Sequence, residues 1–210
     1  MKFKHGDKTD EKHCKALQHE FFRCHDAFTE FVALATQTLS TGDNKLSAYR
    51  MYNAYARFIH HLYEFMTGAL ARELNDTRIA KTNQEVQAKV EQYVTSHAGR
   101  LLRNKRQAID NVKAPGWEQA LASLPPSVPP EFAARFREHR NVVSGHVKHE
   151  RAALDLSDFY QRYHFYMFLL YRDAYGWWGL KGKEMPDLDA ITNFSVLVKQ
   201  QPPAPAAGSA

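Results

Sequence analysis

The stretch that decides the fold is residues 52–65, YNAYARFIHHLYEF. Its apolar residues recur at steps of three and four, which is the spacing of one buried face on an α-helix. The spacing continues on both sides, so we expect a long helix that starts after a capping Asp43 and breaks at residues 75–77. The apolar positions of this helix are Leu46, Tyr49, Tyr52, Tyr55, Ile59, Leu62, Phe65 or Met66, and Ala69.

Two more helices are expected, one on each side of this one. The first runs from about Asp10 and ends at residues 40–42, Ser-Thr-Gly. The second begins at residues 82–85, Thr-Asn-Gln-Glu, which have the form of a capping box whose side chains satisfy free backbone amides. The apolar stripes of the two helices are Leu17, Phe21, Cys24, Phe28, Phe31, Ala35 and Leu39, and Val86, Val90, Tyr93, His97 and Leu101.

The last two predicted helices lie towards the C-terminus. One runs from Glu131 to about Val143, with Pro130 at the first helical position, which suits proline. The other begins at a capping Asp155 or Ser157 and is apolar on two sides. Such a helix lies either in the centre of the core or against another subunit. Its stripes are Phe159, Tyr163, Tyr166, Leu170, Ala174 and Trp177, and Phe165, Phe168 and Leu169.

These patterns predict an all-α fold, an up-and-down bundle of about five helices over residues 10–180. We expect residues 1–9 to be flexible and the proline-rich residues 112–130 to form an extended connection. Residues 181–210 form a C-terminal extension. We expect it to be disordered from about residue 200, because its composition there is dominated by Pro and Ala.

Composition narrows the class of protein. Of the 210 residues, 44% are hydrophobic and 24% are charged, as in ordinary soluble domains, and the net charge of +5 permits an anionic partner. Cys14 and Cys24 lie on one predicted helix at positions that cannot bond to each other, which favours a reduced, cytoplasmic setting. The N-terminal residues lack the apolar segment of a signal peptide. The longest apolar run, residues 165–171, is too short to span a membrane.

Cofactor and metal chemistry find little support in the sequence. It contains neither a phosphate-binding glycine loop nor a nucleophilic Ser or Cys motif, so we expect no cofactor. His60, His61 and Glu64 could offer metal ligands from one helix, but too few ligands are visible to close a site. We therefore expect no metal, and we expect the two histidines to lie at the surface or to bond to a neighbouring helix.

Residues 140–146, RNVVSGH, combine a permanent cation with a titratable imidazole. The guanidinium of Arg140 can stabilise a phosphorane and the imidazole of His146 can move protons near neutral pH, which favours metal-free cleavage of RNA. In a straight helix the two residues would lie about 120° apart around the axis. Because Gly145 readily adopts a left-handed conformation, a helix that ends there can bring His146 back beside Arg140.

Basic residues are densest around this motif, where only Glu138 and Glu150 oppose them. A polyanion would be drawn there, since phosphate contacts give affinity without reading sequence. The alternative is that Arg140 pairs with one of these two glutamates and that His146 is an ordinary loop residue. A second basic cluster within residues 100–106 is more simply a solvated helix face. The predicted RNA contacts are Arg135, Arg137, His139, Lys148, His149 and Arg151.

These features resemble the HEPN family of all-helical domains, many of which are RNases. The resemblance rests on an Arg with a polar residue after it, here Arg140 and Asn141, and on a His a few positions further, here His146. As in the family, this motif lies just before the last predicted helix. Residues 52–65 also look like the corresponding helix of the family. The resemblance covers roughly residues 10–180.

The resemblance implies a homodimer in which the Arg and His of both subunits meet in one cleft at the interface. The implied catalytic residues are Arg140, Asn141 and His146, each present twice. A neutral His146 would take the proton from a ribose 2′-hydroxyl, and the partner's His146 would protonate the leaving 5′-oxygen. Both Arg140 side chains would stabilise the extra negative charge on the phosphate.

We therefore expect a metal-independent endoribonuclease that acts on RNA. A role in phage defence, or as a toxin with a cognate antitoxin, is implied by the resemblance alone. The main alternative is a non-catalytic helical module that binds RNA, a nucleotide or a protein partner, and it predicts salt-sensitive binding to RNA that stays intact. A third possibility is a purely structural dimerisation bundle, in which Arg140 and His146 could be changed without loss of function.

Overall fold

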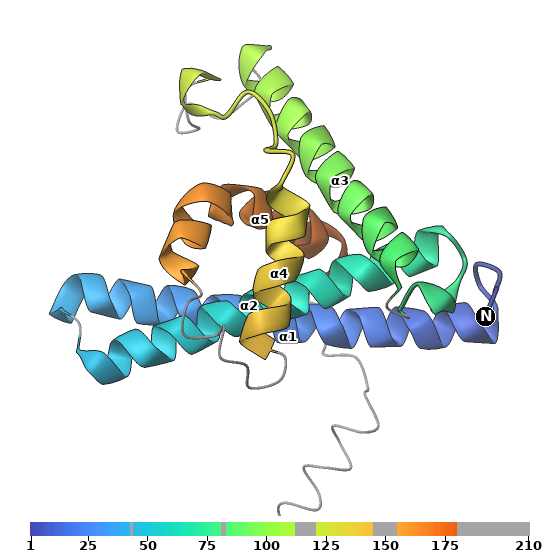
Figure 1. The fold of residues 1–210 in the computed structure, drawn as a ribbon, viewed down its shortest axis with the longest axis horizontal. Helices are drawn as coiled ribbons and strands as arrows, with labels where there is room; N and C mark the ends of the chain where they lie inside the picture. Colours follow the sequence, from blue (N-terminus) through green and yellow to red (C-terminus); the bar gives the residue numbers. More distant parts are fainter. Residues whose placement is uncertain (43, 81–82, 112–120, 145–154, 180–210) are drawn as a thin grey trace, which may run out of the picture. The chain divides into compact units, whose positions relative to one another are not determined.

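Helices account for nearly all of the regular structure in the computed structural model, which describes residues 1–42, 44–80, 83–111, 121–144 and 155–179. Within these ranges the chain forms five α-helices and no β-strand, which confirms the predicted all-α class (Figure 1). None of these helices is both long and apolar enough to cross a membrane. The helices are α1 (Lys8–Thr41), α2 (Lys45–Glu73), α3 (Gln84–Asp110), α4 (Phe132–Ser144) and α5 (Leu156–Trp178), and all belong to the unit Met1–Gly179.

The helices α1 and α2 form a long antiparallel hairpin, drawn in blue and teal in Figure 1. Two histidine contacts fix its register. His13 Nε2 donates to the carbonyl of Gly68 at 2.9 Å, and His61 Nδ1 donates to Glu20 Oε1 at 2.7 Å. Gly68 allows the close approach, because a Cβ at this position would lie 2.7 Å from Leu17 Cδ2. The hairpin therefore brings side chains far apart in the sequence to one place.

Aromatic side chains fill the core where α4 and α5 pack with α2. The rings of Phe136 in α4 and Tyr63 in α2 meet edge to face, with centroids 5.2 Å apart. Phe132 of α4 lies 5.9 Å from the ring of Tyr163 in α5. Full burial of one such apolar ring stabilises the fold by about 1.5–3 kcal/mol. This packing fixes which face of α4 is turned to α2 and which is left to solvent.

The capping residues differ in part from the predicted ones. Asn44 caps α2, and Asn83 caps α3. The residues predicted for these roles, Asp43 and Thr82, lie outside the described part of the chain. An Asn side chain accepts hydrogen bonds from first-turn amides as well as Asp or Thr does, so a neighbouring Asn can take the role. Asp155 caps α5, as predicted.

The buried face of α3 lies one residue later than predicted. Tyr93, His97 and Leu101 were expected in the core, and all three are only partly buried. The polar ends of Tyr and His reach solvent at the edge of a buried face, so these residues flank the core instead of filling it. The fully buried positions of α3 are Val90, Val94, Ala98 and Leu102.

Several predicted core positions near helix ends are exposed instead. Trp177 in α5 is 83% exposed and Leu39 in α1 is 89% exposed. Leu46 and Tyr49, at the start of α2, are also exposed. The apolar stripe marks the correct face at these positions, but no described helix covers it there. Phe165, Phe168 and Leu169, the second predicted stripe of α5, are partly buried.

The N-terminal residues pack against the end of α2, although we expected residues 1–9 to be flexible. Phe3 is 8% exposed and its amide donates to the carbonyl of Asn75 at 3.1 Å. Asp7 then caps α1, so the helix begins two residues earlier than predicted. Burial of the apolar Phe3 side chain offsets the conformational entropy that this short segment loses when it is ordered.

The proline-rich connection is only partly an extended segment. Leu121–Ser123 form a 3₁₀ turn, and Leu124 after it is buried. Arg106 of α3 donates to the carbonyl of Leu124 at 3.2 Å, which ties this end of the connection to the bundle. Residues 112–120 and the predicted disordered tail lie outside the described residues.

Candidate functional site

The side chain of Arg140 projects from α4 towards α2. It lies one helical turn after Phe136, which is fully buried against α2, so both residues share the inner face of α4. Its Nη2 donates to Glu64 of α2 and its Nη1 donates to Asn141 Oδ1 at 2.9 Å. The guanidinium carbon lies 5.8 Å from the centre of the Tyr63 ring. We call Arg140, Asn141, Glu64 and Tyr63 the Arg140 site.

One hydrogen-bond donor of the guanidinium remains unused. The Nε of Arg140 is buried and has no hydrogen-bond partner among the described residues. The side chain as a whole is 29% exposed, and that of Glu64 is 32% exposed. The ion pair is therefore accessible to water, and it contributes about 1 kcal/mol or less to the stability of the fold.

Two pockets border the pair formed by Arg140 and Glu64. One has a volume of about 440 Å³ and is bordered by α1 and α2, with His13 and Glu20 in its wall. The other has a volume of about 80 Å³ and includes Asn141. A small anion that entered either pocket would meet the guanidinium from the side.

Of the three residues predicted to be catalytic, Arg140 and Asn141 lie together. His146 falls within residues 145–154, outside the described residues, and so does Gly145, where we expected the helix to end. The same range holds three of the predicted RNA contacts, Lys148, His149 and Arg151. The described part of α4 reaches Ser144, close to the predicted Val143. The proximity of His146 to Arg140 therefore stays a prediction.

Among the described residues, the acidic partner of Arg140 is Glu64 of α2, which was not considered for this role from the sequence. Glu138 pairs instead with Arg135, at 2.7 Å. Positions 135 and 138 are three apart and share a helix face, whereas positions 138 and 140 are two apart and do not. Glu150 lies outside the described residues. The partner, Glu64, is 76 residues away in the sequence, and only the packing of α4 on α2 brings it close.

The basic residues of α4 are less available to RNA than their number implied. Arg137 Nε donates to Glu91 Oε1 of α3 at 2.6 Å, and Arg135 is held by Glu138. His139 is 7% exposed, its ring stacks on Phe159 at 4.1 Å, and its Nδ1 donates to the Arg135 carbonyl. This burial does not fit the predicted contact of His139 with RNA. The residue belongs to the packing between α4 and α5.

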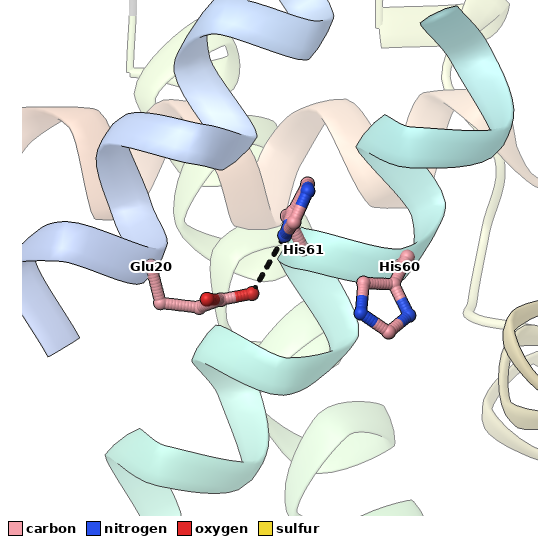
Figure 2. A group of neighbouring side chains, drawn as sticks. All are labelled: Glu20, His60 and His61. Atoms are coloured by element: carbon pink, nitrogen blue, oxygen red, sulfur yellow. Dashed lines mark hydrogen bonds and ion pairs between the residues drawn. The ribbon is translucent and has the colours of Figure 1, made fainter. Parts of the chain in front are cut away.

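A second cluster of polar side chains borders the larger pocket. It consists of Glu20 on α1 and of His60 and His61 on α2, and we call it the two-histidine cluster (Figure 2). One donor atom from each of the three residues lies within 4.8 Å of the others. The sequence pointed to Glu64 as the carboxylate near these histidines, but Glu64 binds Arg140. His61 bonds to the neighbouring helix α1, as one of the two interpretations of this pair predicted.

Burial and charge set the protonation of this cluster. Burial lowers the pKa of His60, and the adjacent His61 lowers it further, so the His60 ring is neutral at pH 7. Burial is the largest single influence on Glu20 and would raise its pKa, but the hydrogen bond from His61 and the nearby positive charges of His61 and Arg23 together lower the pKa on balance. The cluster therefore holds one carboxylate and at least one neutral imidazole, which are the forms that bind metal ions.

Comparisons with protein-family models, with curated proteins and with solved structures find no match for this chain. The resemblance to the HEPN family thus rests on the residues quoted from the sequence and stays a prediction. The chemistry of the site has to be argued from the contacts of Arg140 and its neighbours.

Proposed function

We propose that the protein is a metal-independent endoribonuclease that acts as a homodimer, with Arg140, Asn141 and His146 of both subunits at one site. The observation that carries the proposal is the state of Arg140. Its guanidinium is held by Glu64 and Asn141, has a buried Nε without a hydrogen-bond partner among the described residues, and borders two pockets. A preorganised, partly exposed cation beside a pocket is suited to a phosphate whose negative charge grows during the reaction.

The proposed reaction needs no group beyond these side chains. The 2′-oxygen of a ribose attacks the adjacent phosphorus, and a neutral His146 takes the proton of the hydroxyl. The bond from phosphorus to the 5′-oxygen breaks, and the partner's His146 gives that oxygen a proton. The products are a 2′,3′-cyclic phosphate and a free 5′-hydroxyl. Because the two imidazoles act in opposite protonation states, the rate should follow a bell-shaped pH curve.

Glu64 has a positioning role in this proposal. In the protein without RNA it holds the guanidinium of Arg140 in place and balances its charge. A phosphate in the pocket would compete with Glu64 for the same Nη2 atom. Since the pair is partly solvated, this exchange costs little free energy.

The second subunit would cover apolar surface that one chain leaves open. On α5, Tyr160 is 40% exposed and Trp177 is 83% exposed, while Phe165 and Phe168 are partly buried. Large aromatic side chains of this kind are common at the centre of protein interfaces. A cytoplasmic role in phage defence, or as a toxin held by an antitoxin, would fit such an enzyme.

The test is an RNA cleavage assay in EDTA with the full chain. We expect cleavage by the wild type, and a loss of at least about 100-fold in Arg140→Ala and in His146→Ala, since each removes a group that acts in the transition state. Arg162→Ala is the matched control, because Arg162 is also an ion-paired helical arginine but binds Glu131 on another face. An RNA with a 2′-deoxy sugar at the cut site should resist cleavage.

A non-catalytic RNA-binding module is the second candidate. The ion pairs of Arg135, Arg137 and Arg140 favour weak binding over catalysis, because each reduces the positive charge that α4 offers to a transition state, whereas all three pairs are partly exposed and RNA phosphates can still compete for the guanidinium groups. In that case RNA would bind with salt-sensitive affinity and remain intact after long incubation. Cleavage that survives both site substitutions would instead remove Arg140 and His146 from the site.

A further inference from the structure

We propose that Glu20, His60 and His61 bind a divalent transition-metal ion such as Zn²⁺. The inference rests on the meeting of two helices, because α1 supplies the carboxylate and α2 supplies both imidazoles (Figure 2). It goes beyond the proposed nuclease, whose chemistry uses no metal and none of these three side chains.

The distances are close to those of a coordination site. In a tetrahedral zinc site with bonds of about 2.0–2.1 Å, neighbouring donor atoms are roughly 3.3 Å apart. His61 Nδ1 and Glu20 Oε1 lie 2.7 Å apart, joined by a hydrogen bond, and the whole set of donor atoms lies within 4.8 Å. An ion would replace the proton between His61 and Glu20. The wider separations, up to 4.8 Å, would have to shorten through side-chain rotation on the two helices.

The donor types select the class of metal. Two imidazole nitrogens and one carboxylate oxygen suit Zn²⁺ and its neighbours Co²⁺, Ni²⁺ and Cu²⁺, whereas Mg²⁺ and Ca²⁺ prefer oxygen ligands. Three protein ligands leave a fourth position for water. Glu20 and His60 line the pocket of about 440 Å³, so that position opens into a space with room for water or a small ligand.

The surroundings of the cluster both favour and limit binding. The Nδ1 of His60 is buried without a hydrogen-bond partner among the described residues, so the ring is not committed to another contact through that atom. Arg23 lies 3.7 Å from the second oxygen of Glu20 and Arg140 lines the same pocket, and both cations oppose an incoming ion. The carboxylate of Glu64 offsets the positive charge of Arg140. The expected site is therefore of moderate affinity and is filled by exchangeable metal.

The chain offers a matched control for these residues. His97 of α3 donates through Nε2 to Asp173 Oδ2 of α5 at 2.9 Å. Like His61 with Glu20, it is a partly buried histidine bonded to a carboxylate on another helix, but no third ligand adjoins it among the residues described. A substitution at His97 removes a histidine of the same kind without touching the proposed site.

The experiment uses the full chain, stripped of metal with a chelator that is then removed, and titrated with Zn²⁺ in a calorimeter. We expect one equivalent of moderate affinity per chain, and a weakening of at least about tenfold in Glu20→Gln, His60→Gln and His61→Gln, since removal of even an outer partner of a ligand costs that much. His97→Gln should bind as the wild type does. Co²⁺ in place of Zn²⁺ should give the visible absorption of a four-coordinate ion in the wild type and in His97→Gln alone.

A thermal melt with and without Zn²⁺ separates a lost ligand from a lost fold. Binding to the folded state raises Tm, so the wild type should gain stability with Zn²⁺ while the three cluster variants keep their helical circular dichroism but gain none. The proposal is overturned if no stoichiometric binding occurs, or if the cluster variants bind Zn²⁺ as His97→Gln does. Neither result bears on the nuclease, which is measured with RNA in EDTA.

Discussion

The inner face of α4 contains two regions that are held in different ways. Towards its start, Phe132 and Phe136 are fully buried and pack against the rings of Tyr63, Tyr163 and Tyr166. One turn further, Arg140 is partly exposed and is held by one ion pair and one hydrogen bond. The first region is apolar and buried, whereas the second is polar and borders two pockets.

The two regions of α4 therefore differ in how much they contribute to stability. Removing a buried ring leaves a cavity that the core cannot fill, and the cost is large. Removing a partly solvated ion pair costs little, because water replaces the lost contacts. A helix anchored at one end can therefore carry a partly exposed cation at the other end with little cost to its stability.

The largest expected effect is that of Phe136→Ala. The loss of a fully buried ring should lower the free energy of unfolding by about 3–5 kcal/mol, as measured by urea denaturation. Tyr49→Ala is the control, because Tyr49 is 63% exposed and should change stability by no more than about 0.5 kcal/mol. If both substitutions lower the free energy of unfolding by the same amount, the buried rings of α4 are not what anchors this helix in the fold.

A titratable group in the aromatic core should give the next largest effect. Burial lowers the pKa of His164 in α5 from 6.5 to about 4. As pH falls below 6.5 the unfolded chain takes up a proton that the folded chain refuses, so stability is full above that pH and falls between pH 6.5 and 4. The loss should reach up to about 3 kcal/mol.

Urea midpoints at pH 7 and pH 4.5 measure this loss for the wild type and for His164→Gln. The variant has no imidazole at this position, so its stability should depend less steeply on pH. The other titrating groups are common to both proteins and cancel in the difference. Equal slopes would mean that the His164 ring is protonated as readily in the folded as in the unfolded chain.

The smallest effect is expected for Glu64→Gln, at the open end of α4. The side chain keeps its size and can still accept a hydrogen bond from Arg140, so the free energy of unfolding should change by less than about 1 kcal/mol. The loss of one negative charge beside Arg140 should strengthen RNA binding several-fold at low salt, and the gain should shrink as salt is raised. Fluorescence anisotropy with a labelled RNA measures both. Weaker binding would mean that Glu64 itself contacts RNA.

Helices could be predicted from the sequence because their cause is local. The spacing of apolar residues in α2 and the Ser-Thr-Gly end of α1 gave bounds within two residues of those found. Exposure near helix ends could not be predicted, because whether Leu39 or Trp177 is covered depends on where another helix stops. The apolar stripe of a helix shows which face is buried, but it does not show how far the helix that covers this face extends.

The contacts of the site could be predicted only in part, for the same reason. Arg140 was found as a candidate from its own position in the sequence, but its partner Glu64 comes from another helix. Glu20 was missed because a short turn after Gly42 predicts an antiparallel hairpin without its exact offset. If the predicted register between α1 and α2 is wrong by one helical turn, a residue other than Glu20 is expected opposite His61. Contacts between helices are set by packing, which no single stretch of sequence encodes.

The most direct test of the account is a double-mutant cycle on RNA cleavage in EDTA. It compares the initial rates of the wild type, Arg140→Ala, His146→Ala and the protein with both substitutions. If the two side chains act on one phosphate, the double variant should be hardly slower than either single variant, because residues that work as a unit are lost together. If the two losses multiply, or if the double variant still cleaves RNA at the wild-type rate, Arg140 and His146 do not form the active site.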